Sequence, residues 1–210
     1  MRYKLILFFY LFANTLNAQS VSSDKALELA VMQFNQLSGS AAYQSVYIQF
    51  EKLYLADKKN WLIPYYASIL KSRMCLMKLG DRDQLANEAI SWILKAKSIA
   101  INDEIYCAES LANTAKMSVN PAMRWLLYED KIKTPLQLAK KVNANNPRIY
   151  LLEANIQRKL PVLFGGGCKA AIPMAKKAVQ LLHVQVLQNT NMPGWGNQSL
   201  VEFKSACPFN

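Results

Sequence analysis

From residue 24 onward, apolar residues recur every three or four positions along most of the chain. Ile149, Leu152, Ile156 and Leu160 are one example, and this spacing places them on one face of an α-helix. The pattern therefore predicts an all-α protein. We expect helices at about residues 24–37, 41–56, 62–79, 83–100, 103–117, 135–142, 147–160 and 169–187, which form four pairs, with a short extra helix at 121–130.

Turn and capping residues separate these segments. In the pair Asn146-Pro147, the asparagine supplies a side-chain oxygen for the unbonded amides of a helix start, and proline suits the first helical position. The pair Thr134-Pro135 repeats this arrangement. Pro161 and the three glycines at 165–167 predict a tight turn before the last expected helix.

The helical pattern also repeats along the chain. A Lys-Ala pair ends at Ala96 and another at Ala178, each seven residues after an earlier alanine, and weaker copies place Leu53 and Ala139 at the same position. The spacings between successive copies are 43 residues from Leu53 to Ala96, 43 from Ala96 to Ala139 and 39 from Ala139 to Ala178. A period of this length fits pairs of antiparallel helices stacked in a solenoid. We expect the alanines where neighbouring helices approach closely.

Two alanines seven residues apart, as at Ala89 and Ala96, resemble the second helix of a tetratricopeptide (TPR) repeat. Residues 143–148 resemble the turn between such repeats, with Ala144 where a proline is usual. Together with residues 164–173 and 193–196, they make the chain similar to small exported TPR-like proteins of Gram-negative bacteria whose function is unassigned. The resemblance covers about residues 61–195. It implies a TPR-like α-α superhelix and, by analogy, a binding role.

The first residues predict export. Arg2 and Lys4 precede an apolar run at residues 5–13, and Ala18 offers a cleavage point, which together are typical of a secretory signal peptide. The run is too short to span a membrane. We therefore expect a signal peptide at 1–18, a TPR-like helical domain at 19–200 and an irregular tail at 201–210, in a secreted or periplasmic protein without a transmembrane segment in its mature form.

No enzyme, metal or cofactor signature is present in the sequence. His183 is the single histidine, so no Ser-His-Asp set can be assembled, and the four cysteines have no C-x-x-C spacing. The glycines before Lys169 lack the ending of a phosphate-binding loop. They are interpreted as an inter-helix turn, although amides at the helix start around Lys169 could hold an anion or a carboxylate.

The four cysteines of an exported chain permit three pairings. We favour a disulfide between Cys168 and Cys207, because it would tie the tail to the glycine turn. Cys75 and Cys107 lie in apolar helical segments, where buried thiols are common.

The formal net charge is +11, which favours acidic partners, an anionic surface or an anionic ligand. The lysines are scattered in the manner of solvated helix faces, and export argues against nucleic acid as a partner. Tyr43, Tyr47, Tyr65 and Tyr66 have two interpretations: core packing between the first helix pairs, or the lining of a binding groove. Trp195 lies between two glycines and is expected to anchor the tail against the last expected helix, at residues 169–187.

Two functions remain open at this stage. The first is an exported, non-enzymatic scaffold that binds an unidentified protein or peptide, with Tyr43, Tyr47, Tyr65, Tyr66 and Lys169 as its candidate surface. The alternative is a periplasmic solute-binding protein that holds a small apolar or anionic ligand between the helical repeats. An enclosed pocket would favour the second, and an open groove lined by lysine and tyrosine would favour the first.

Overall fold

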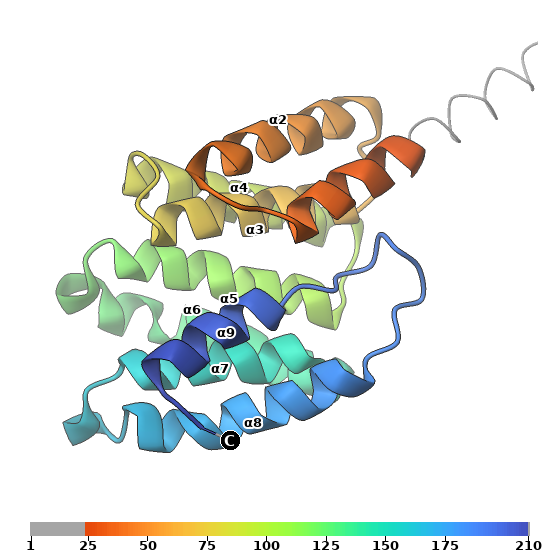
Figure 1. Cartoon of the computed structure of the whole chain (residues 1–210). Coiled ribbons are helices and arrows are strands. Elements are labelled where there is room, and N and C mark those ends of the chain that lie inside the picture. Colours follow the sequence, from red (N-terminus) through yellow and green to blue (C-terminus); the bar gives the residue numbers. More distant parts are fainter. Residues whose placement is uncertain (1–23, 210) are drawn as a thin grey trace, which may run out of the picture.

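The computed structural model describes residues 24–209, so the expected signal peptide lies outside the described residues. Within 24–209 every regular element is helical, as predicted (Figure 1). A helix over residues 24–35 comes first. It is followed by α2 (Ser40–Ala56), α3 (Leu62–Leu76), α4 (Arg82–Ile99), α5 (Asp103–Ser118), α6 (Pro121–Val142), α7 (Pro147–Lys159), the 3-10 turn η1 (Val162–Phe164), α8 (Cys168–Val184) and α9 (Asn197–Ala206).

Consecutive helices pack as pairs, and the pairs stack into a superhelix. The closest pairings are α3 with α4, α5 with α6 and α7 with α8. Helices α3, α5 and α7 also contact one another in order and form an inner row. The last helix, α9, packs against α8 and α7, and in Figure 1 it lies in front of the inner row. The predicted all-α superhelix is therefore confirmed, with α9 as an addition to the four pairs.

The repeated alanines lie where helices meet. Ala89, Ala96, Ala139, Ala171 and Ala178 are all fully buried. A larger side chain at these positions would push the paired helices apart, because protein interiors are packed as closely as organic crystals. The small residues read from the sequence as packing positions thus explain how the repeats stack.

The expected break between residues 130 and 135 is wrong, because α6 runs without interruption and contains Pro135. Proline removes one backbone hydrogen bond from a helix interior and crowds the preceding turn. The Ser110 hydroxyl on α5 donates to the Ile132 carbonyl at 2.8 Å, which gives a partner to an acceptor in the affected turn. A contact from the neighbouring helix therefore helps the proline to be accommodated.

The expectation of an irregular tail is also wrong, because α9 covers residues 197–206. Its Leu200 and Phe203, followed by Cys207, are buried at helical spacing. Phe203 and Cys207 pack against Ala154 and Ala171 of α7 and α8. This apolar stripe is only two turns long, and packing against α7 and α8 stabilises it as a helix.

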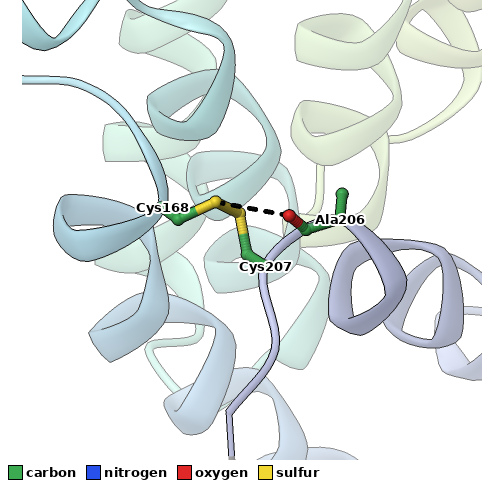
Figure 2. The surroundings of a disulfide bond; sticks show 3 residues. All are labelled: Cys168, Ala206 and Cys207. Carbon is green, nitrogen blue, oxygen red and sulfur yellow. Dashed lines mark hydrogen bonds between the residues drawn. A yellow bond between two sulfur atoms is a disulfide. The ribbon is translucent and has the colours of Figure 1, made fainter.

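A disulfide joins Cys168, the first residue of α8, to Cys207, just after α9, with 5.3 Å between the two Cα atoms (Figure 2). This is the pairing favoured from the sequence. Cys75 and Cys107 are buried free thiols. In the described range, no helix is both long and apolar enough to cross a bilayer.

Candidate functional site

A groove lies between the inner row and the C-terminal segment, and we call it the inner groove. Its volume is about 380 Å³, which falls in the usual range of small-molecule sites. It is lined by α3, α5, α7 and α9, with Tyr43 contributed by α2 and Trp195 by the loop before α9. Most of its wall is apolar and aromatic, including Leu76, Met77, Leu111, Leu151, Leu152 and Ile156.

Positive charge dominates the polar part of this lining. Arg73, Arg158 and Lys159 face a single acidic residue, Glu202. The Nε atom of Arg158 is buried and has no hydrogen-bond partner among residues 24–209. An unpaired buried donor of this kind is costly, and because Nε itself is closed off from solvent, only the rest of the Arg158 guanidinium could meet a ligand in the groove.

Arg73 is the central cation of the groove. Its guanidinium lies 4.9 Å from the ring centre of Phe34 and 5.3 Å from that of Trp195, both within cation–π range. Burial lowers its pKa, although not enough to remove the charge from a guanidinium. In the described part of the chain, no carboxylate lies within ion-pair distance of it. Arg73 and Arg158 therefore offer two positive groups beside an apolar wall.

Trp195 is held in place as one wall of the groove. It is only 6% exposed, and its indole N–H donates to the Tyr65 hydroxyl at 2.8 Å. Tyr65 in turn donates to the Glu104 carboxylate at 2.7 Å. Arg148 donates to the same carboxylate at 2.6 Å and to the Trp195 carbonyl at 3.3 Å. Trp195 thus anchors the tail through hydrogen bonds to α3 and α7, whereas the sequence led us to expect the helix at 169–187 as its partner.

Burial governs the charges in this network. It raises the pKa of Glu104, an effect that the nearby positive charge of Arg148 opposes. It also raises the pKa of Tyr65 well above its usual value, so the hydroxyl stays protonated and can donate to Glu104. The network therefore links α3, α5, α7 and the loop before α9 through one buried ion pair.

The candidate surface expected from the sequence is not assembled. Tyr47, Tyr65 and Tyr66 are buried, and their hydroxyls bond within the protein. Burial raises the pKa of Tyr47 to about 12. Only Tyr43 lines the inner groove, and Lys169 is exposed in the first turn of α8 outside that lining. For most of these tyrosines the core-packing interpretation is therefore the one that the structure supports.

The groove residues missed from the sequence are mainly Arg73, Arg158 and Glu202. They look like any other charged residue on a helix, so their spacing carried no signal. His183, the single histidine, is exposed on α8 and does not line the groove. Within residues 24–209, no group of three or more histidine, cysteine, aspartate or glutamate side chains could hold a metal ion.

A second hollow of about 560 Å³ lies near the starts of α5 and α7 and the loop after α8. Its charged residues include Asp103, Glu104 and Arg148. They already bond to one another or to the amide of Asn146. The arginine of this hollow, Arg148, pairs with Glu104, whereas those of the inner groove have no carboxylate partner in the part of the chain that the structure describes. We therefore favour the inner groove as the candidate site.

Comparison with known proteins gave one relevant likeness. No family model and no curated protein matches the chain. Among solved structures, the HusA haemophore from Porphyromonas gingivalis is similar to it, with 27% sequence identity and a TM-score of 0.77. The similarity covers 88% of this chain and 92% of that chain, so it extends over nearly all of both proteins. A haemophore is a haem-binding protein and not an enzyme.

Proposed function

We propose that this protein is an exported, non-enzymatic carrier that binds haem or a related porphyrin in the inner groove. The observation that carries the proposal is the groove itself, where apolar and aromatic walls stand beside two arginines that have no carboxylate partner among residues 24–209. The similarity to the HusA haemophore supports porphyrin as the ligand class. The solute-binding alternative drawn from the sequence is therefore favoured over the protein-binding scaffold.

The chemistry of a porphyrin fits these residues. Its flat apolar ring would pack against Trp195, Tyr43 and the leucines of α7, since aromatic side chains bury large areas against planar groups. Its two carboxylates would bond to Arg73 and Arg158, because guanidinium and carboxylate groups form paired, charge-assisted hydrogen bonds. Among the described lining residues, Tyr43 and Met77 carry oxygen and sulfur atoms of the kinds that ligate haem iron.

The scaffold hypothesis is less well supported because of α9. A TPR-like protein that binds a peptide would offer the inner row of helices as an open surface. Here α9 lies in front of that row and is fixed at its end by the Cys168–Cys207 disulfide (Figure 1). The space that remains suits a small molecule better than an extended chain.

Export is proposed on two grounds. The sequence predicts a signal peptide at residues 1–18, and disulfides persist in oxidising compartments outside the cytosol. A carrier of an external ligand would work in the same location.

The test is a titration of the mature protein with haemin and, separately, with metal-free protoporphyrin. Binding is followed by the absorbance of the porphyrin and by the quenching of tryptophan fluorescence. We expect saturable binding, and we expect Arg73→Gln and Arg158→Gln each to weaken it about tenfold, the size of one lost charge-assisted hydrogen bond. The matched control is Lys169→Gln, an exposed cation outside the groove, which should bind as the wild type does.

The two probes separate iron ligation from recognition of the ring and its carboxylates. Binding of haemin alone would mean that an iron ligand, such as Tyr43 or Met77, supplies most of the affinity. No saturable binding of either probe, or full binding by the double arginine variant with an unchanged melting temperature, would refute the proposed site.

A further inference from the structure

A second surface stands apart from the groove, at the turn between α7 and α8. Three consecutive apolar side chains project there into solvent: Val162 is 78% exposed, Leu163 88% and Phe164 74%. We call these three residues of η1 the apolar tip. Single exposed apolar residues are normal on proteins, but a contiguous group on one turn indicates a surface that contacts something.

The turn holds the apolar tip in a defined shape. The amides of Phe164 and Gly166 donate to the Pro161 carbonyl, and the amide of Gly167 donates to the Gln157 carbonyl at 3.1 Å. Gly165 and Gly167 have φ angles of 76° and 90°, which side chains rarely allow. At Gly166 an added Cβ would overlap the Leu160 backbone. The sequence of three glycines therefore builds a tight turn that leaves its apolar side chains outside.

The base of the tip is also fixed. Helix α8 begins at Cys168, directly after the glycines, and the disulfide ties this residue to the end of α9 (Figure 2). The backbone hydrogen bonds within the turn also leave few of its amides and carbonyls unbonded. This lowers the cost of placing the turn in an apolar environment, where an unbonded amide or carbonyl is costly.

Exposed lysines follow the tip along α8. Between Glu153 and Glu202 the sequence contains no acidic residue and five basic ones, which are Arg158, Lys159, Lys169, Lys176 and Lys177. Arg158 and Lys159 line the inner groove, whereas Lys169 follows the turn directly and Lys176 and Lys177 are exposed further along α8. An apolar wedge with basic residues beside it has the composition of proteins that bind at the interface of an anionic bilayer.

We propose that the apolar tip docks the protein on anionic phospholipid bilayers. Val162, Leu163 and Phe164 enter the boundary between head groups and acyl chains, while the exposed lysines of α8 lie against the lipid phosphates. The tip lies on the edge of the helix stack where α3 joins α4 and α5 joins α6 (Figure 1). This docking is independent of the inner groove, whose lining residues do not include the tip.

The experiment is flotation of the disulfide-bonded protein with vesicles of phosphatidylcholine, with and without phosphatidylglycerol. We expect binding to the phosphatidylglycerol vesicles that weakens as salt is added. The double change Leu163→Glu and Phe164→Glu should lower the bound fraction about tenfold or more, because it removes the wedge and adds like charge to the lipid. Lys176→Gln with Lys177→Gln should weaken binding while leaving the wedge intact.

The matched control is Leu55→Glu. Leu55 is 73% exposed in the last turn of α2, and α2 ends at the opposite edge of the helix stack in Figure 1, so this change should leave vesicle binding as it is. Haemin titration of the tip variant should match the wild type, which keeps this result separate from the proposed groove. The proposal is overturned if the wild type does not float with either vesicle, or if the tip variant floats equally well. Binding to host envelopes that disappears after protease treatment, without any binding to lipid vesicles, would overturn it in favour of a protein partner.

Discussion

Replacing Cys168 and Cys207 together by serine tests how the C-terminal helix is held. The disulfide spans a sequence separation of 39 residues. In the chain-entropy description, a cross-link of this length removes enough freedom from the unfolded chain to stabilise the fold by about 4 kcal/mol. For a protein of this size, a loss of that order lowers the melting temperature by about 8–16 °C.

The structure adds a local consequence to this global one. Helix α9 has ten residues, which is too short to be stable by itself, and it is held by the burial of Leu200 and Phe203 and by the disulfide. Gln198 and Glu202 of α9 line the inner groove. Without the cross-link, α9 should detach from α7 and α8 more often, and porphyrin affinity should fall together with the free energy of unfolding.

The measurement is guanidinium unfolding followed by circular dichroism, for the wild type and the double serine variant, each with and without a reductant. Reductant should bring the wild type down to the level of the variant and should leave the variant unchanged, which makes the variant its own control. Equal unfolding midpoints for the oxidised wild type and the double variant would show that the reasoning about the cross-link is wrong.

Two further perturbations test the charges in the described part of the chain. Arg148→Ala leaves the Glu104 carboxylate buried without its cation and should cost about 3–5 kcal/mol in denaturant unfolding, whereas Lys140→Ala, which breaks a more exposed pair, should cost about 1 kcal/mol or less. Hydrogen bonds from Arg124 and Lys116 lower the pKa of Asp83, so its carboxylate stabilises the fold above its ordinary pKa near 4, and this contribution fades as the pH falls further. The difference in unfolding midpoint between wild type and Asp83→Asn should therefore be larger at neutral pH than at about pH 3, and a difference that does not change with pH would contradict this assignment.

Much of the fold follows from local pattern. Periodic apolar residues, the Asn146-Pro147 helix start and the glycine turn at 165–167 act over a few residues, and the structure places helices and a turn there. The Lys-Ala repeat also predicts that helix pairs stack. Ala96 and Ala178 are fully buried, and a larger side chain there would separate the closely packed helices. The Cys168–Cys207 pairing could also be predicted from sequence position, because one cysteine adjoins a turn and the other lies in the C-terminal segment that a disulfide would tie down.

Position in space accounts for the rest. Pro135 was read as a helix start, yet it lies inside α6, beside a turn that the Ser110 hydroxyl on another helix contacts. Residues 197–206 form a helix because other elements bury its apolar side chains: Phe203 packs against Ala154 of α7 and Ala171 of α8, and Leu200 joins the main core. Arg73 and Arg158 carry the same charge as many surface lysines and arginines. They become candidate ligand-binding groups only because α9 folds back over the inner row and encloses them with Trp195, a contact between residues far apart in the chain that no local spacing encodes.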